Sequence, residues 1–154
     1  MTEICFRKFT AADANDFKAL NIEWLNTYFV VEEIDEKVLS HPQTEILDKG
    51  GFVFMVTLAE ETVATFAYIK KAEGIYEFTK MAVKPLLRGK GIGNRIMQFA
   101  IRFAEQHHWK KILLYSNTLL ENSIHLYRKY GFIEVPLEKD TIYSRGNIKM
   151  ELSL

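Results

Sequence analysis

Residues 76–93 read YEFTKMAVKPLLRGKGIG, an apolar-rich segment that runs through a proline into a basic turn with three glycines. The first part is typical of a β-strand, and Pro85 ends the pairing of that strand because it has no N–H group to donate. Gly89, Gly91 and Gly93 carry no side chains that would keep backbone N–H groups from an anion. The helix that follows adds unpaired N–H donors and the positive end of its dipole. The stretch therefore predicts a strand, a phosphate-binding turn and a helix in succession.

The spacing of these glycines differs from that of two commoner phosphate-binding motifs. Counted from Gly89, the second glycine of a Walker A loop, G-x-x-x-x-G-K-[ST], would fall at Asn94, and no Lys-Ser or Lys-Thr pair follows. The Rossmann fingerprint, G-x-G-x-x-G, would place its third glycine at Asn94 or Ile96. An unrelated protein that binds adenine nucleotides through this turn is therefore a disfavoured alternative.

Two segments match the signatures of a known family. Arg88–Gly93, RGKGIG, has the form [QR]-x-x-G-x-[GA], and Asn122 followed by LYRKYGF at residues 126–132 has the form N…LYxxxGF. In these segments the chain resembles the GCN5-related N-acetyltransferases (GNAT), whose motif for the pyrophosphate of acetyl-coenzyme A (acetyl-CoA) has the first form. The two segments also occur in the order of that family and at a similar separation.

The resemblance predicts the fold for nearly the whole chain. The GNAT fold is an α+β fold of the three-layer α/β type. Its central mixed, mostly antiparallel sheet has six to seven strands and carries helices on both faces. The length of 154 residues and the hydrophobic content of 48% suit one domain with one core. We therefore expect a single domain over residues 1–154.

Charge and composition narrow the range of partners. Twenty basic residues balance twenty acidic ones, which argues against nucleic acid or an anionic membrane as a partner.

The single cysteine, Cys5, cannot form an intramolecular disulfide, and the four histidines show no metal-ligand spacing with it, so we expect no metal. Because no apolar run approaches ~20 residues, we expect a cytoplasmic protein. Dimers are frequent in the resembled family, so a homodimer is an open alternative.

A helix is predicted from Ala11, because the apolar residues after it recur at intervals of three and four. This stripe consists of Phe17, Leu20, Trp24 and Tyr28. In the resembled family this segment lines the side of the acceptor substrate, which implies Trp24, Tyr28 and Phe29 as candidates for the acceptor pocket. Packing in the core is the alternative for each of them.

Acidic residues cluster after this helix, at Glu32, Glu33, Asp35 and Glu36. We favour a solvated start of a second helix over residues 35–39, since acidic side chains suit a helix N-terminus. Attraction of a cationic amine towards the acceptor site is the alternative.

Periodicity places the remaining elements. Alternation along the strand predicts one face with Glu77, Thr79, Met81 and Val83 and another with Tyr76, Phe78, Lys80 and Ala82. The helix after the glycine turn shows a buried stripe of Ile92, Ile96, Ala100, Phe103 and His107. Thr118–Glu121 is typical of a capping box, the helix after it is expected to end at Gly131, and residues 142–152 are predicted to close the sheet.

The resemblance implies how acetyl-CoA would be held. Its pyrophosphate would contact backbone N–H groups in the turn, and its pantetheine arm would lie against the main chain of the strand like an extra strand. The residues concerned are Arg88, Gly89, Lys90, Gly91, Ile92 and Gly93 in the turn, and Met81, Ala82 and Val83 in the strand. The side chains of Arg88 and Lys90 add positive charge. Asn122 matches a family asparagine that contacts pantetheine. Asn117 is a second candidate for this contact. In the alternative interpretation, Asn117 only completes the turn.

Acetyl transfer requires that the amine lose a proton and that the departing thiolate gain one. The position of Tyr127 in the LY of the family segment makes it the candidate acid, because a phenol with a pKa near ~10 is protonated at neutral pH. Glu77, six residues before Val83, matches a strand glutamate that serves as base in part of the family. The alternatives are a buried aromatic for Tyr127 and a salt-bridged strand carboxylate for Glu77.

These residues lead to one expected function and one alternative. The resemblance implies an acetyl-CoA-dependent N-acetyltransferase that acts on a primary amine of a small molecule, peptide or protein. The alternative is a catalytically silent CoA-binding sensor or regulatory module on the same fold. The presence of both Tyr127 and Glu77 favours the enzyme. By analogy with the fold, residues 143–147, YSRGN, are expected to border the acceptor pocket.

Overall fold

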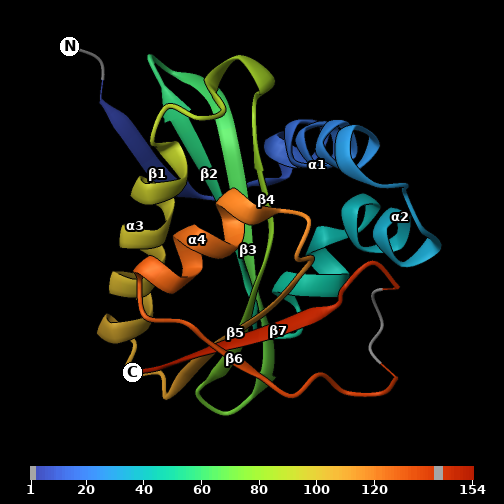
Figure 1. The fold of residues 1–154 in the computed structure, drawn as a ribbon. Helices are drawn as coiled ribbons and strands as arrows, with labels where there is room; N and C mark the ends of the chain where they lie inside the picture. Colours follow the sequence, from blue (N-terminus) through green and yellow to red (C-terminus); the bar gives the residue numbers. More distant parts are fainter. Residues whose placement is uncertain (1–2, 141–143) are drawn as a thin grey trace.

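The computed structural model describes residues 3–140 and 144–154 (Figure 1). Within these residues, seven strands form one sheet in the order β1-β2-β3-β4-β5-β7-β6. The strands are β1 Ile4–Lys8, β2 Phe52–Leu58, β3 Glu61–Ala72, β4 Ile75–Val83, β5 Lys111–Ser116, β6 Ile133–Val135 and β7 Ile148–Ser153. All neighbouring strands pair antiparallel except β4 and β5, which are parallel. The expected mixed, mostly antiparallel sheet is thus confirmed.

Helices flank both faces of the sheet, as expected (Figure 1). The α-helices of the described chain are α1 Ala14–Tyr28, α2 Glu33–Ser40, α3 Ile92–Gln106 and α4 Glu121–Lys129. Short helical turns occur at η1 Ala11–Asp13, η2 Gln43–Leu47 and η3 Pro85–Leu87. The helix predicted from Ala11 thus begins with a 3-10 turn, and the one predicted over residues 35–39 is longer at both ends. No helix in the described ranges is long and apolar enough to cross a membrane.

Two apolar clusters, one on each face, hold the helices to the sheet. The larger cluster lies under α3 and α4, and the smaller one joins α1 and α2 to β2 and β3. Because successive β2 residues point to opposite faces, Phe54 and Val56 join the larger cluster, whereas Val53 and Met55 join the smaller. The stripe predicted for α3 is confirmed at four buried positions, Ile92, Ile96, Ala100 and Phe103. His107, the fifth position, is exposed just beyond the end of the helix.

Strands β4 and β5 pair over only three residues, Ile75–Glu77 with Lys111–Leu113, and then diverge. Beyond Glu77, the side of β4 that faces β5 has no strand partner among the described residues. A strand edge of this kind offers backbone groups to an added extended segment. The divergence therefore creates a place in the middle of the sheet where a ligand can reach the main chain of β4.

A β-bulge interrupts β4 close to this divergence. The register of β4 against β3 shifts by one residue, so that Lys80 and Met81 both lie opposite Phe66. Lys80 adopts a φ of +57°, in the left-handed region that non-glycine residues rarely occupy. The bulge turns Lys80 towards the face that carries Glu77, and its Nζ lies 4.0 Å from Oδ1 of Asp35 on α2. The strict alternation predicted for this strand, with Lys80 opposite to Glu77, is therefore wrong.

The start of α4 also differs from the prediction. Leu120 precedes the helix without any side-chain cap, and residues 118–119 form a turn. The side-chain oxygen of Asn117 accepts a hydrogen bond from the N–H of Leu119 at 2.8 Å. This Asx turn satisfies the backbone locally and moves the helix start to Glu121, so the capping box predicted at residues 118–121 does not form.

The end of α4 agrees with the prediction. Gly131 adopts a φ of +97°, and the N–H of Phe132 donates to the carbonyl oxygen of Tyr127 at 3.1 Å. This Schellman pattern fixes Tyr127 in the last turns of the helix. The last strand, predicted over residues 142–152, begins at Ile148. Residues 141–143 lie outside the described residues, and residues 144–147 form the loop before β7.

Candidate functional site

A pocket lies where β4 and β5 diverge. Its walls come from these two strands, from α1, α2 and α4, and from the loop before β7. The lining residues are Asn21, Trp24, Leu25, Phe29, Asp35, Phe78, Thr79, Lys80, Met81, Tyr115, Ser116, Asn117, Leu120, Ser123, Tyr127, Arg145 and Gly146. Elements far apart in the sequence meet here because the parallel pairing of the two strands ends early.

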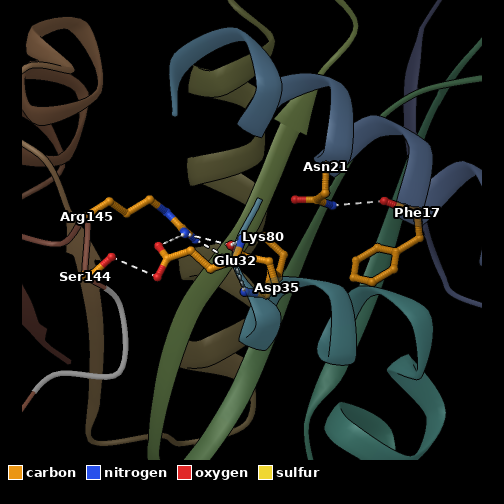
Figure 2. A network of polar contacts seen from close by, with 7 residues as sticks. All are labelled: Phe17, Asn21, Glu32, Asp35, Lys80, Ser144 and Arg145. Atoms are coloured by element: carbon orange, nitrogen blue, oxygen red, sulfur yellow. Dashed lines mark hydrogen bonds and ion pairs between the residues drawn. The ribbon is translucent and has the colours of Figure 1, made fainter. Parts of the chain in front are cut away.

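One wall of the pocket is charged (Figure 2). Arg145, from the loop before β7, donates to both oxygens of Asp35, each at 2.8 Å. It also donates to Glu32 at 3.1 Å, and the other oxygen of Glu32 accepts from Ser144 at 2.8 Å. With Lys80, 4.0 Å from Asp35, these groups link α2, β4 and the loop before β7. We call Glu32, Asp35, Lys80 and Arg145 the charged wall.

Burial shapes the ionisation of the charged wall. The side chains of Asp35 and Lys80 are 0% and 5% exposed. Burial alone would raise the pKa of Asp35, but hydrogen bonds from Arg145 and from the N–H of Glu32 outweigh it and lower that pKa. Burial lowers the pKa of Lys80, and the charges of Asp35 and Glu77 oppose this shift. Asp35 is therefore a carboxylate whose charge is compensated inside the protein.

The acidic segment before α2 is more than a solvated helix start. Glu33 and Glu36 are exposed, which fits that interpretation. Asp35 is fully buried and pairs with Arg145, so the interpretation is wrong for this residue. The partner arrives 110 residues later in the chain, which no local pattern indicates. Among the described residues, no group of three His, Cys, Asp or Glu side chains is placed to hold a metal ion.

Residues 88–93, here called the glycine loop, follow η3 and include the first two residues of α3. Gly89 and Gly91 adopt φ values of +76° and +86°, in the region that favours glycine. A Cβ atom at either position would meet no heavy atom within 4 Å, so the surface of the loop is open. No hydrogen bond between described residues uses the N–H groups of residues 89–94. These donors are therefore available to an anion at the start of α3.

The side chain of Arg88 has partners within the protein. Its Nε donates to the carbonyl oxygen of Val83 at 3.1 Å, its guanidinium pairs with Glu23 of α1, and it lies 5.5 Å from the centre of the Tyr28 ring. Arg88 therefore ties the glycine loop to β4 and α1. The positive charge expected beside an anion is left to Lys90, which is exposed.

The residues at the start of α3 hold the glycine loop against α4. A Cβ atom at Gly93 would lie 3.3 Å from a leucine side chain of α4, so glycine permits the two helices to pack closely. The side-chain oxygen of Asn94 accepts from Lys129 at 2.9 Å and from the Tyr130 hydroxyl at 3.1 Å. Because α4 also carries Tyr127, these contacts place the loop and the pocket on neighbouring parts of one helix pair.

The two predicted catalytic side chains occupy different positions relative to the pocket. Tyr127 lines it and is 8% exposed, and burial raises the pKa of its hydroxyl to about 12. Glu77 lies on β4, is 1% exposed and stands outside the lining. Its Oε1 lies 3.7 Å from Nζ of Lys71. The structure thus brings Tyr127 to the pocket lining and leaves Glu77 outside it.

The two candidate asparagines also differ. Asn117 lines the pocket, and its Nδ2 donates to the carbonyl oxygen of Arg145 at 2.7 Å. Asn117 therefore links the end of β5 to the loop that carries Arg145. Asn122 is exposed on α4 and lies outside the lining.

Two of the three candidate aromatics reach the pocket. Trp24 and Phe29 line it, with their ring centres 5.8 Å apart. Tyr28 is 45% exposed and stands outside the lining, against the guanidinium of Arg88. The period of the helix predicts that Trp24 and Tyr28 share one buried stripe. In the structure only Trp24 of the two lines the pocket, because Tyr28, the last residue of α1, is exposed.

Of the charged wall, the sequence predicts the position of Arg145 near the pocket but not that of Lys80. Of residues 143–147, which are expected to border the acceptor pocket, Arg145 and Gly146 line the pocket between β4 and β5, and Tyr143 lies outside the described residues. Lys80 was assigned to the opposite face, because a bulge has no reliable signature in the sequence. Of the three strand residues expected to hold pantetheine, Met81 lines the pocket.

Protein families and curated proteins give different results in comparison with this chain. A family model described as an acetyltransferase (GNAT) domain matches residues 25–134. That range runs from the end of α1 to the start of β6 and contains the glycine loop and Tyr127. Among proteins with curated descriptions, none matches the chain significantly in sequence.

Solved structures share the fold at low sequence identity. A GNAT-family acetyltransferase of Staphylococcus aureus Mu50 has a TM-score of 0.85 at 14% identity, over 98% of this chain and 99% of that one. The paia N-acetyltransferase of Thermoplasma acidophilum, in complex with coenzyme A, has a TM-score of 0.76 at 17% identity, over 99% of each chain. The spermidine N-acetyltransferase of Vibrio cholerae, in complex with CoA and spermine, has a TM-score of 0.74 at 20% identity, over 97% of this chain and 95% of that one. The expected fold is thereby confirmed.

Proposed function

This chain belongs to the GNAT family of acetyltransferases, and we propose that it transfers the acetyl group of acetyl-CoA to a primary amine of a small molecule, peptide or protein. One observation carries this proposal: a pocket lined by Tyr127 lies between two diverging strands, and the glycine loop packs beside the helix that carries this tyrosine. Such a site suits a long ligand with an anionic part and a reactive end. We take residues 1–154 as one catalytic domain.

The residues of the chain fit acetyl-CoA as the second substrate. The N–H groups and open surface of the glycine loop suit a diphosphate, and Lys90 adds a positive charge. The main chain of residues 81–83 suits the pantetheine arm, with Asn117 and Asn122 as side-chain candidates. Similar structures from Thermoplasma acidophilum and Vibrio cholerae contain CoA, which supports the same ligand here. The thioester supplies an activated acetyl group.

Two side chains of the chain are proposed to move protons. The reaction forms an N–C bond and breaks a C–S bond, so the amine must lose a proton and the sulfur must gain one. We assign the first proton to Glu77, through a water molecule, because its carboxylate is buried and is not part of the pocket lining. We assign the second to Tyr127, whose raised pKa keeps its hydroxyl protonated at neutral pH. Trp24 and Phe29 form the proposed apolar wall for the acceptor.

Release of free thiol from acetyl-CoA tests this function. With a panel of primary amines, we expect thiol release that depends on the amine and the enzyme. A thermal-shift series should show stabilisation by acetyl-CoA, but not by ATP or NAD, since a ligand of the native state raises stability by RT ln(1 + [L]/Kd). Stabilisation by acetyl-CoA without thiol release from any amine would instead support a silent CoA-binding module.

Glu77→Gln is expected to lower kcat about 100-fold at neutral pH, because the variant cannot accept the proton of the amine. The deficit should shrink as the pH approaches about 10, where more of the amine is already neutral. Steady-state kinetics across this range measure both effects. The matched control is Glu151→Gln. Glu151 lies on β7, and its carboxylate pairs with Lys111 of β5 at 3.2 Å. A kcat of Glu77→Gln that equals the wild-type value would remove Glu77 as the base.

A further inference from the structure

The carboxylates at the pocket already have cationic partners from the chain itself. Of the described residues that line the pocket, Asp35 is the only acid, and it accepts two hydrogen bonds of 2.8 Å from Arg145. Glu32, at the edge of the charged wall, also accepts from Arg145, at 3.1 Å. Glu77, which is outside the lining, lies 3.7 Å from Nζ of Lys71. Each of these three carboxylates is therefore paired with a basic side chain of the protein.

Positive charge and apolar surface make up much of the remaining lining. Lys80 and Arg145 both line the pocket, and Lys80 is 5% exposed at its side chain. Apolar side chains also line the pocket, among them Trp24 of α1, Phe29 just after that helix and Phe78 of β4. The pocket thus offers an apolar surface next to the charged wall, in which the two acidic side chains are already paired with the two basic ones.

A second ammonium group on an acceptor would find no compensating charge in such a pocket. It would lose its hydration and lie near the guanidinium of Arg145, which carries charge of the same sign. To gain a carboxylate partner in the lining it would have to displace Arg145 from Asp35, and breaking a buried ion pair leaves a charge uncompensated. An apolar tail has no charge to dehydrate and needs no carboxylate partner, and burial of its surface favours binding.

We infer that the acceptor is a monoamine carried on an apolar body, and that the charged wall excludes acceptors with a second positive charge. This inference rests on the proposed acetyl transfer and adds the class of its acceptor. It also separates this chain from the similar spermidine N-acetyltransferase of Vibrio cholerae, whose structure contains spermine, a polyamine.

The test compares two amines of equal length that differ only at the far end. Octylamine ends in a methyl group, and 1,7-diaminoheptane has an ammonium group in the same place. Calorimetry with the CoA-bound protein measures the Kd of each, and thiol release measures kcat/KM. We expect octylamine to be favoured about 100-fold in both measurements. Equal or tighter binding of the diamine, or binding of neither amine, would overturn the inference.

A variant of the charged wall connects this preference to its cause. Arg145→Met leaves Asp35 and Glu32 without their shared cation, so we expect the preference for octylamine to fall at least about 10-fold. Lys149→Met is the matched control, because Lys149 pairs with Glu138 and Glu151 and stands outside the pocket lining. If Arg145→Met does not fold, Lys80→Met removes the other cation of the wall and should lower the same ratio. An unchanged ratio in a folded variant of the wall would contradict its role.

The two readouts separate this inference from the proposed function. A binding preference for octylamine without any thiol release would support the acceptor class and contradict acetyl transfer. Thiol release with both amines at equal kcat/KM would support acetyl transfer and overturn the acceptor class.

Discussion

Replacing Gly91 with leucine is expected to abolish detectable binding of acetyl-CoA while the protein stays folded. A Cβ atom at Gly91 would meet no heavy atom within 4 Å, so the new side chain has room in the isolated protein. The same open space is where a diphosphate would approach the N–H groups of the glycine loop. A side chain there blocks that approach, and we expect the Kd to rise by roughly 100-fold or more. Calorimetric titration with acetyl-CoA measures this change.

The control for Gly91→Leu must carry the same backbone strain. Gly91 has a φ of +86°, so leucine costs about 1–2 kcal/mol of stability in this left-handed conformation. Gly50, in the turn before β2, has a φ of +91°, and a Cβ atom there would meet the flexible side chain of Lys70. Gly50→Leu should therefore lose similar stability and keep its affinity for acetyl-CoA. Binding of wild-type strength by Gly91→Leu would show that the glycine loop is not the phosphate site.

Tyr127→Phe is expected to lower kcat about 100-fold and to change the Kd of acetyl-CoA by less than about 2-fold. The change removes one hydroxyl from a buried ring that lines the pocket and keeps the ring itself in contact with the core. Burial raises the pKa of this hydroxyl to about 12. Loss of its proton should therefore not limit the wild-type rate below a pH of about 11.

Tyr130→Phe is the matched control for the tyrosine. Tyr130 follows the same helix, but its hydroxyl bonds the side chain of Asn94 at 3.1 Å and the residue lies outside the pocket lining. Its loss should change stability slightly and leave kcat near the wild-type value. Equal kcat values for wild type and Tyr127→Phe would exclude this residue as the acid.

Features encoded in a short stretch of sequence could be predicted. The succession of strand, glycine loop and helix is local, because Pro85 ends the strand and glycines permit the left-handed turn. The end of α4 at Gly131 is local for the same reason. Both segments also carry the family signatures, so the fold and the position of Tyr127 at the pocket followed from them.

Features that depend on distant partners could not be predicted. The burial of Asp35 depends on Arg145, which reaches it from the other end of the chain. The position of Lys80 depends on the bulge in β4, which breaks the alternation on which the prediction relied. The charged wall, and with it the inferred class of acceptor, is therefore visible only in three dimensions.

Competing local signals explain the error at the start of α4. Thr118–Glu121 has the pattern of a capping box, but the Asx turn of Asn117 satisfies the N–H of Leu119 first. This turn also binds the loop before β7 through the contact of Asn117 with the carbonyl oxygen of Arg145. A residue that is expected to contact the ligand thus makes a hydrogen bond between the end of β5 and the loop before β7.

A crystal structure of the protein with acetyl-CoA tests the central claim most directly. We predict that the diphosphate accepts hydrogen bonds from N–H groups of residues 89–94, that the pantetheine arm lies along residues 81–83, and that the thioester sulfur lies within reach of the Tyr127 hydroxyl. A complex in which the glycine loop contacts no phosphate, or in which the thioester lies outside the pocket between β4 and β5, would contradict the account.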